Sequence, residues 1–346
     1  MTSFAHQAAQ IDLAALATYL EAKVPGFKGP ITAEKTPTGQ SNPTFLLASP
    51  SGRYVLRKKP PGQLLKSAHA VDREHRVMKA LQDTDVPVPR MVHLCEDDAV
   101  LGTAFFVMEF VDGKVFWDPS LPELEKPQRT KLYDEQNRAL AALHSVDPAK
   151  VGLADFGKAG SYFARQRDRW TKQYKASETE HIEDMETLIK WLEANEPPDD
   201  GRSSLVHGDY RVDNMIFTPD GARLLAVIDW ELSTIGHPFS DLAYQCMQWR
   251  FPNHETMRGL ANVDRTALGI PTEEDYVAKY CERMGLARID NWKFCLAFSF
   301  FRLAAIVQGV KKRGLEGNAS NPEKALKSGE RVPMMAKMGV EAIEAG

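Results

Sequence analysis

Cysteine is scarce in this sequence, and the four that occur are far apart, at Cys95, Cys246, Cys281 and Cys295. Because no C-x-x-C pair is present, we expect neither a zinc site nor a disulfide framework, and a reduced cytoplasm fits. A net charge of −4 gives no reason to expect nucleic acid as a partner. The N-terminus lacks a basic start followed by an apolar run, so no signal peptide is predicted.

Long uninterrupted apolar runs are also missing. The most apolar segment, residues 294–310, contains Arg302 and Gln308 and is short for a bilayer span, so we expect a buried helix and no membrane association. The chain has 346 residues, which is long enough for two lobes or domains. Its composition, 43% hydrophobic and 26% charged, is typical of a globular protein.

The most informative stretch runs from residue 205 to residue 241. His207, Asp209 and Asn214 reproduce the spacing H-x-D-x-x-x-x-N, and Asp229 follows in the sequence Ile-Asp-Trp. This is the layout of a kinase catalytic loop followed by a metal-binding aspartate. A chance match among common loop residues is the alternative.

The residues between Asn214 and Asp229 predict a hairpin. Apolar runs at 215–217 and 224–228 flank Thr-Pro-Asp-Gly at 218–221, which suits a type I turn. A hairpin would set Asn214 and Asp229 side by side. Two adjacent oxygen ligands are what a Mg²⁺ that holds ATP phosphates requires.

The first third of the chain reads as helices and strands. Helices are expected at 11–24 and 68–81, and strands at 31–36, 44–48, 53–58, 91–95 and 104–110. The polar loop that contains Gln40, Ser41 and Asn42 could lay its N–H groups over ATP phosphates, although any surface hairpin could look like it.

The strand at 53–58 ends in cations, and alternation puts Arg57 and Lys58 on opposite faces. One of them could reach the phosphates and pair with Glu74 on the following helix. A solvated strand end and a surface acid are the alternatives. The turn from Glu109 to Gly113 is where backbone groups could bind an adenine edge.

The rest of the chain is mostly helical. Helices are expected at 128–144, 162–174, 182–194, 239–249, 273–284, 292–310 and 322–345. Asp241 lies near the start of one of them, where an acid can cap the helix and brace the catalytic loop.

The order of these parts resembles the aminoglycoside phosphotransferase and choline kinase superfamily, whose members have a protein-kinase-like fold. The resemblance covers roughly residues 28–310 and is most specific in HGDYRVDN, IDWE and GHPFSDLA. GQSNPT at 39–44, VLRKKPPG at 55–62 and FRLAAI at 301–306 resemble the kinase-like domains fused to, or encoded near, acyl-CoA dehydrogenases. That branch is associated with phosphorylation of hydroxylated acyl chains, including 4-hydroxyacyl-CoA thioesters.

The resemblance implies an α+β, two-lobed protein-kinase-like fold. A small, mostly antiparallel β lobe would occupy residues 1–110, and a larger helical lobe residues 111–346, with a catalytic loop at 205–217 and a metal-binding segment at 227–241. Asp209 would deprotonate the acceptor hydroxyl, and Asn214 and Asp229 would bind Mg²⁺.

Other roles also follow from the resemblance. ATP contacts are implied for Gln40, Ser41, Asn42, Arg57, Lys58, Glu74, Glu109 and Val111. His207 and Asp241 would support the catalytic loop, and Arg302 and Trp249 are candidate substrate contacts. Arginine at position 57 departs from the family, which has lysine there.

We therefore expect a cytoplasmic, ATP- and Mg²⁺-dependent small-molecule kinase, a phosphotransferase with an alcohol acceptor, acting on an anionic hydroxylated acyl compound. An aminoglycoside or amino-alcohol phosphotransferase and a catalytically silent nucleotide-binding scaffold are the alternatives. Trp230-Glu231 stands where protein kinases have Phe-Gly, which argues against a protein kinase. The sequence does not fix the oligomeric state.

Overall fold

The computed structural model describes residues 11–36, 42–60, 70–254, 257–319 and 321–344. The chain divides into two compact units. Unit 1 comprises Met1–Lys114, Met215–Pro219 and Leu224–Ser233, and unit 2 comprises Val115–Asn214, Asp220–Arg223 and Thr234–Gly346. The division therefore differs from a single boundary after residue 110, because the hairpin between Asn214 and Asp229 belongs to unit 1.

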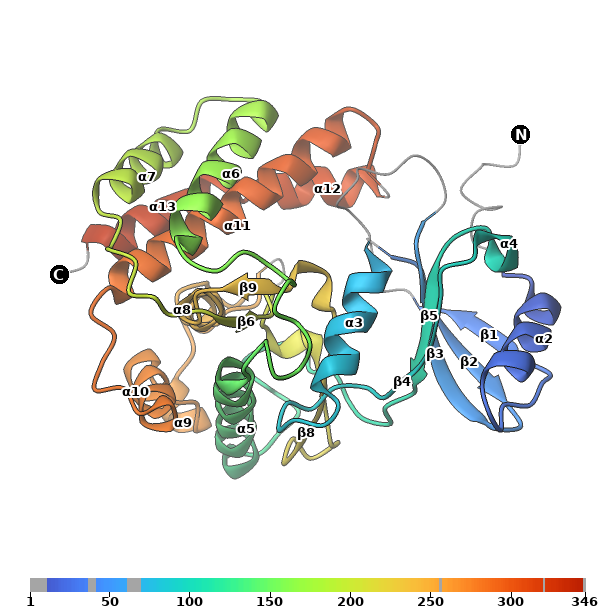
Figure 1. Ribbon diagram of the computed structural model, residues 1–346. Coiled ribbons are helices and arrows are strands. Elements are labelled where there is room, and N and C mark those ends of the chain that lie inside the picture. Colours follow the sequence, from blue (N-terminus) through green and yellow to red (C-terminus); the bar gives the residue numbers. More distant parts are fainter. Residues whose placement is uncertain (1–10, 37–41, 61–69, 255–256, 320, 345–346) are drawn as a thin grey trace. The chain divides into compact units, whose positions relative to one another are not determined.

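Unit 1 is built on an antiparallel sheet with the strand order β1-β2-β3-β5-β4 (Figure 1). Its strands are β1 (Thr32–Lys35), β2 (Thr44–Ser49), β3 (Gly52–Lys58), β4 (Met91–Cys95) and β5 (Phe105–Glu109). All five strands were predicted. The central position of β3 places Arg57 on the strand that is paired on both sides.

Two helices cover opposite faces of this sheet: α2 (Leu13–Lys23) and α3 (Val71–Leu81). Phe105 joins the core under α2, whereas Phe106 contacts His75 of α3. Successive side chains of β5 thus point into two different cores, as the pleat of a strand requires. A one-turn helix, α4 (Asp98–Leu101), was not predicted.

The predicted hairpin is present. Its strands, β7 (Met215–Phe217) and β8 (Leu224–Val227), pair antiparallel. Lys114 and Phe217 exchange two backbone hydrogen bonds, of 2.8 and 2.9 Å. These bonds explain why the hairpin belongs to unit 1.

Unit 2 is organised around α11 (Trp292–Leu315). This helix is long and apolar enough to cross a membrane, and 72% of its most apolar window is buried inside the structure. Its neighbours are α6 (Tyr162–Ser177), α7 (Glu183–Ala194), α8 (Phe239–Cys246), α12 (Pro322–Gly329) and α13 (Val332–Glu344) (Figure 1). The expected buried helix is therefore the core helix of unit 2.

A second part of unit 2 carries the catalytic-loop sequence. Its elements are α5 (Lys126–Ser145), β6 (Ser204–Val206), η1 (Val212–Asn214), β9 (Thr234–Gly236), η3 (Met247–Trp249), α9 (Arg265–Leu268) and α10 (Glu273–Met284). The antiparallel β6–β9 pair was not predicted, because strands of three residues are too short to show an alternating pattern.

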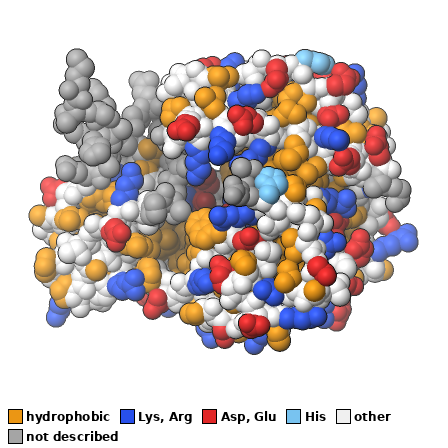
Figure 2. Space-filling view, turned by 180° about the vertical axis from the view of Figure 1, so that it is seen from behind, with side chains coloured by type: hydrophobic (Ala, Val, Ile, Leu, Met, Phe, Trp, Pro, Cys, Tyr) orange, Lys and Arg blue, Asp and Glu red, His pale blue; other side chains and the backbone are white. Residues whose placement is uncertain are grey.

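The helix expected at 322–345 is wrong as a single element, since the chain breaks between α12 and α13. Pro333 is the second residue of α13. Proline lacks an N–H group and is tolerated in the first turn of a helix but not in its interior, so the helix restarts beside it. On the face in Figure 2, acidic and basic side chains are interspersed, in keeping with the small net charge.

Candidate functional site

Arg57 is the centre of a cluster of ion pairs in unit 1. Its Nε lies 3.1 Å from Glu74 Oε2. One terminal nitrogen lies 2.7 Å from Asp229 Oδ1 and 3.4 Å from Glu231 Oε2. The structure thus brings together the strand cation, the helix acid and the aspartate of the Ile-Asp-Trp motif. Glu231 is an addition that the sequence analysis missed.

Burial and charge act in opposite directions in this cluster. Burial opposes the charge on Arg57, but the attraction of Glu74, Asp229 and Glu231 outweighs it and raises the pKa of Arg57. Glu74 is 2% exposed, and burial, with repulsion from the other two carboxylates, raises its pKa to about 8 despite the attraction of Arg57. Three carboxylates facing one guanidinium leave this cluster with an excess of acid.

Lys58 points away from the ion pairs. Its Nζ donates to the Leu101 carbonyl at 2.9 Å, and burial lowers the pKa of this amine. Arg57 therefore occupies the position expected for a phosphate-contacting cation, whereas Lys58 is used to join β3 to α4.

Asp229 has a left-handed backbone, with φ 67° and ψ 58°. It precedes η2 (Trp230–Leu232), and the buried Trp230 indole donates to the Val227 carbonyl at 2.9 Å. A non-glycine residue at positive φ stores strain, and such residues concentrate at functional sites. This conformation was not visible in the sequence.

The catalytic-loop sequence in unit 2 is fixed by Asp241. Its two carboxylate oxygens accept the backbone N–H groups of His207, at 2.6 Å, and Gly208, at 2.8 Å. Burial alone would raise the pKa of Asp241, but its hydrogen bond to His144, the attraction of His144 and His207, and the Gly208 N–H together lower it. Asp241 is thus a buried carboxylate that braces the loop, the role expected of it.

Gly208 is held from a second side by α11. With φ 86°, a conformation that favours glycine, its carbonyl accepts a hydrogen bond of 2.9 Å from Arg302. Arg302 is 4% exposed and lies 5.9 Å from the Trp170 ring centroid and 5.5 Å from that of Tyr244. The buried cation is thus paired with a backbone carbonyl.

The Asp209 carboxylate is held by two side chains of its own loop. Asn214 Nδ2 donates to Oδ2 at 2.9 Å, and Arg211 Nε lies 3.1 Å from Oδ1. Burial opposes the charge of Asp209, but Arg211, Tyr244, His207 and Asn214 outweigh it and lower its pKa. Asp209 is therefore ionised at neutral pH, as a base must be.

The side-chain oxygen atoms of Asp229, Glu231 and Asn214 are suitable ligands for a magnesium ion. Asp229 and Glu231 are carboxylates, the ligands that a hard divalent cation prefers. Asn214 directs its amide nitrogen to Asp209, at its carboxylate and its backbone carbonyl, which turns the amide oxygen away for a ligand. Asn214 belongs to unit 2 and Asp229 to unit 1, so their meeting at one Mg²⁺ stays a prediction.

The other predicted contacts are placed as follows. Asn42 is buried, and its carbonyl accepts the Thr44 hydroxyl at 3.2 Å, whereas Gln40 and Ser41 lie outside the described residues. The Glu109 N–H donates to the Arg90 carbonyl at 2.9 Å, so an adenine contact at Glu109 would use its carbonyl. The predicted contact through Val111 stays a prediction.

Trp249 was expected as a substrate contact, but its side chain is built into the core of unit 2. It is 4% exposed, and its indole nitrogen donates to the Pro271 carbonyl at 2.8 Å. Its ring packs against Tyr133 and Tyr276. With its one donor used and its faces covered, Trp249 has a structural role.

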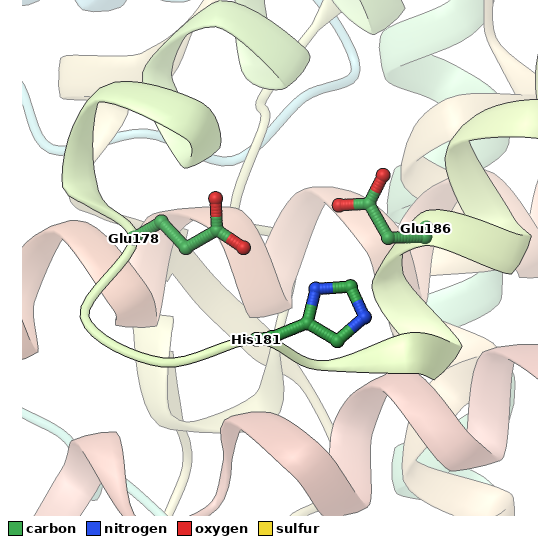
Figure 3. A group of neighbouring side chains, drawn as sticks. All are labelled: Glu178, His181 and Glu186. Atoms are coloured by element: carbon green, nitrogen blue, oxygen red, sulfur yellow. The ribbon is translucent and has the colours of Figure 1, made fainter.

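Glu178, His181 and Glu186 form a second group of possible metal ligands, between α6 and α7 (Figure 3). Lys175 is ion-paired with Glu186 and lies 3.9 Å from Glu178. The cation that balances these carboxylates is therefore already part of the chain, and the group is explained as a surface ion-pair cluster.

The sequence of this site has known relatives. Residues 32–274 match the phosphotransferase enzyme family. The chain belongs to this family. Among curated relatives, mouse acyl-CoA dehydrogenase family member 10 is 50% identical over 311 residues, which is 90% of this chain and 29% of that protein. The chain thus spans less than a third of the length of this relative.

Solved structures of the phosphotransferase family agree with the fold. A candidate aminoglycoside phosphotransferase from Ralstonia eutropha JMP134 is 49% identical, with a TM-score of 0.88 over 97% of this chain and 99% of that one. Aminoglycoside phosphotransferase APH(4)-Ia, in a ternary complex with AMP-PNP and hygromycin B, has a TM-score of 0.62 at 16% identity, over 96% and 99% of the two chains. The expected α+β kinase-like fold and the expected branch are confirmed.

Proposed function

We propose that this protein is a cytoplasmic, ATP- and Mg²⁺-dependent kinase that phosphorylates a hydroxyl group of an anionic acyl compound, such as a 4-hydroxyacyl-CoA. The observation that carries the proposal is Asp209, an ionised carboxylate held by Asn214 and Arg211 in a phosphotransferase-family loop. A silent scaffold has no need for a carboxylate held in this way.

In this mechanism Asp209 accepts the proton of the acceptor hydroxyl while the hydroxyl oxygen bonds to the γ-phosphorus and ADP leaves. Arg57 provides positive charge for the phosphates, held by Glu74. Asp229, Asn214 and Glu231 would hold Mg²⁺, which when bound neutralises phosphate charge. The chain's own contribution is thus orientation and charge rather than covalent chemistry.

Two observations support an acyl acceptor. The curated relative named above is an acyl-CoA dehydrogenase family member. Arg302, a buried cation that bonds the backbone of the loop next to the base, suits an anionic acceptor. Aminoglycosides are polycations and favour carboxylate-lined sites. The name of the Ralstonia relative nevertheless keeps aminoglycoside phosphorylation as the second candidate.

The test is ATP consumption by the purified protein with Mg²⁺ and a panel of hydroxyacyl-CoAs, amino alcohols, sugars and kanamycin. We expect turnover with a 4-hydroxyacyl-CoA and little with kanamycin. Robust kanamycin phosphorylation would establish the second candidate instead. Tight MgATP binding without turnover of any acceptor would make the protein a nucleotide-binding scaffold.

A further inference from the structure

The core helix α11 has a face that the rest of the protein covers only partly. Leu303, Ile306 and Val310 are half-buried on it, although most of the helix is buried. Their spacings of three and four residues place them on one side of the helix, and we call them the apolar strip. The helices α6 and α12 pack against other sides of α11. The strip is therefore an apolar surface on a rigid helix, where part of a ligand can lie.

The apolar strip begins beside the catalytic loop. Arg302, the residue before Leu303, donates to the Gly208 carbonyl at 2.9 Å, and Gly208 precedes Asp209 in the chain. Ile306 follows Arg302 by one helical turn and lies on the same side of α11. The inner end of the strip is thus close to the loop that carries the base of the proposed function.

A cation stands at the outer end of the strip. Arg313 lies about three turns beyond Arg302, so it projects from about the same side of α11, about 16 Å farther along the helix axis. Its side chain is exposed, and among the residues that the structure describes no carboxylate lies within ion-pair distance of it. Its neighbour Lys311, by contrast, is paired with Glu180. The charge of Arg313 is therefore available for a ligand.

A second donor meets Arg313 over Gly309. A Cβ atom at this glycine would lie 3.3 Å from Gln173 Nε2, on α6, and 4.0 Å from Arg313 Nη1. Two N–H donors from different helices thus face the space that the missing side chain leaves. A phosphate group offers both negative charge and several acceptor oxygens to such a pair of donors.

These features fit an elongated acceptor that has an apolar part near its hydroxyl and a phosphate far from it. We propose that α11 binds the CoA arm of an acyl-CoA acceptor: the acyl chain and pantetheine lie along the apolar strip, and a phosphate of CoA contacts Arg313 and Gln173. The inference rests on the proposed function, which places the acceptor hydroxyl at Asp209. In CoA an extended pantetheine arm separates the acyl group from the diphosphate, as the strip separates Arg302 from Arg313.

The test compares a CoA thioester with the same acyl group on pantetheine, which has no phosphate. With ATP and Mg²⁺, Arg313→Gln should lower kcat/KM for a 4-hydroxyacyl-CoA about 10-fold, as expected for the loss of a hydrogen bond to a charged group. It should leave kcat/KM for the 4-hydroxyacyl-pantetheine within about twofold of the parent value. Arg288→Gln is the matched control, because it removes an exposed arginine that is paired with Asp290, and it should change neither value.

Ile306→Ala tests the apolar strip itself. Both thioesters have the same acyl chain and pantetheine, so kcat/KM should fall about 5-fold for both as apolar contact is lost. Leu315→Ala is the control. This leucine is 58% exposed and lies about two and a half turns beyond Ile306, on the opposite side of the helix, so its removal should change neither value.

Binding of free CoA gives a readout that needs no turnover. In calorimetry with AMP-PNP and Mg²⁺ at saturation, which fill the nucleotide site, CoA should bind the parent about 10-fold more tightly than it binds Arg313→Gln. Dephospho-CoA identifies the phosphate concerned. An equal loss of affinity for both compounds assigns the diphosphate to Arg313, whereas a loss confined to CoA assigns the 3′-phosphate.

The outcomes separate the two ideas. If the parent protein turns over no acceptor, the proposed function is overturned, and the CoA titration still tests the subsite. Equal CoA affinity in the parent and Arg313→Gln, or an equal loss of kcat/KM for both thioesters in that variant, overturns the subsite. A variant that loses only thermal stability would make Arg313 a contact that stabilises the C-terminus of α11, which also overturns the subsite.

Discussion

The two charged clusters of this protein differ in what they lack. In unit 1, three carboxylates face the single guanidinium of Arg57. In unit 2, Asp209 and Asp213 share Arg211, and the buried Arg302 pairs only with a backbone carbonyl and aromatic rings among the described residues. The first cluster thus has more carboxylates than cations, whereas in the second cluster Arg302 is a buried cation whose partners among the described residues include no carboxylate.

This difference assigns different ligands to the two units. An excess of carboxylate suits a divalent cation, and a buried guanidinium without a carboxylate suits an anionic group, because an unbalanced buried charge is costly. We therefore assign MgATP to the cluster of unit 1 and the acceptor to that of unit 2. Three substitutions test this assignment, and a fourth tests the pH dependence of stability in unit 1.

The largest effect is expected for Asp229→Ala. It removes a carboxylate from the cluster of unit 1, and we expect Mg²⁺-dependent ATP binding to be abolished. Calorimetry with and without Mg²⁺ measures this. Glu34→Ala, which removes an exposed carboxylate from β1, is the control and should bind MgATP as the parent does. Parental affinity in Asp229→Ala would show that Ile-Asp-Trp is not the metal motif.

Asp209→Asn should separate binding from chemistry. The amide keeps the size of the side chain but cannot act as a base, so turnover should fall by about 10²- to 10⁴-fold while ATP affinity is nearly unchanged. Asp213→Asn is the matched control, because this neighbouring carboxylate also contacts Arg211. A fully active Asp209→Asn variant would remove Asp209 from the mechanism.

Arg302→Leu tests whether the buried cation of unit 2 contacts the acceptor. We expect KM for the acyl acceptor to rise about 10-fold, or kcat to fall by a similar factor, as the cation is lost. The protein should remain folded. Arg169→Leu removes an exposed cation from beside the Trp170 ring and should have little effect. A folded and fully active Arg302→Leu variant would contradict an anionic acceptor contact at this position.

The smallest effect concerns pH and α3. Burial first, with repulsion from Lys79 and His93, lowers the pKa of His75 from 6.5 to about 4. Between these values the unfolded chain binds more protons, so stability falls as the pH falls from 6.5 toward 4. When unfolding in urea is measured at several pH values, the free energy of unfolding of His75→Gln should fall less steeply with falling pH than that of the parent.

Glu74 has the opposite effect on the pH dependence of stability. Its pKa rises from 4.5 to about 8, so the folded state binds more protons in that window and loses stability as the pH rises through it. Glu74 and His75, which are neighbours on α3, therefore change stability with pH in opposite directions. If the free energy of unfolding of His75→Gln fell more steeply toward acid pH than that of the parent, the predicted direction of the His75 pKa shift would be wrong.

Much of the molecule follows from its sequence because the signals are local. The strands of unit 1, the hairpin and most helices were predicted from periodicity and turn residues. The pairing of Arg57 with Glu74 followed from the order of strand cation and helix acid. These features depend on residues within one element or its neighbours.

The missed features depend on contacts that sequence spacing does not encode. Arg57 meets Asp229 across 172 positions, and the left-handed turn at Asp229 brings Glu231 to the same guanidinium. Trp249 was a candidate substrate contact, and only tertiary packing shows that its indole nitrogen is engaged.

The return of the hairpin to unit 1 also bears on how the protein can be divided. A cut after Lys114 would produce an N-terminal fragment without its two later segments, Met215–Pro219 and Leu224–Ser233. That fragment would leave unpaired the backbone groups of Lys114 and Pro87 that bond Phe217 and Val227 in the whole protein. Neither unit is a module that recombination could transplant by one crossover. A gene fusion must carry both units, which is the arrangement over which the acyl-CoA dehydrogenase relative matches this chain.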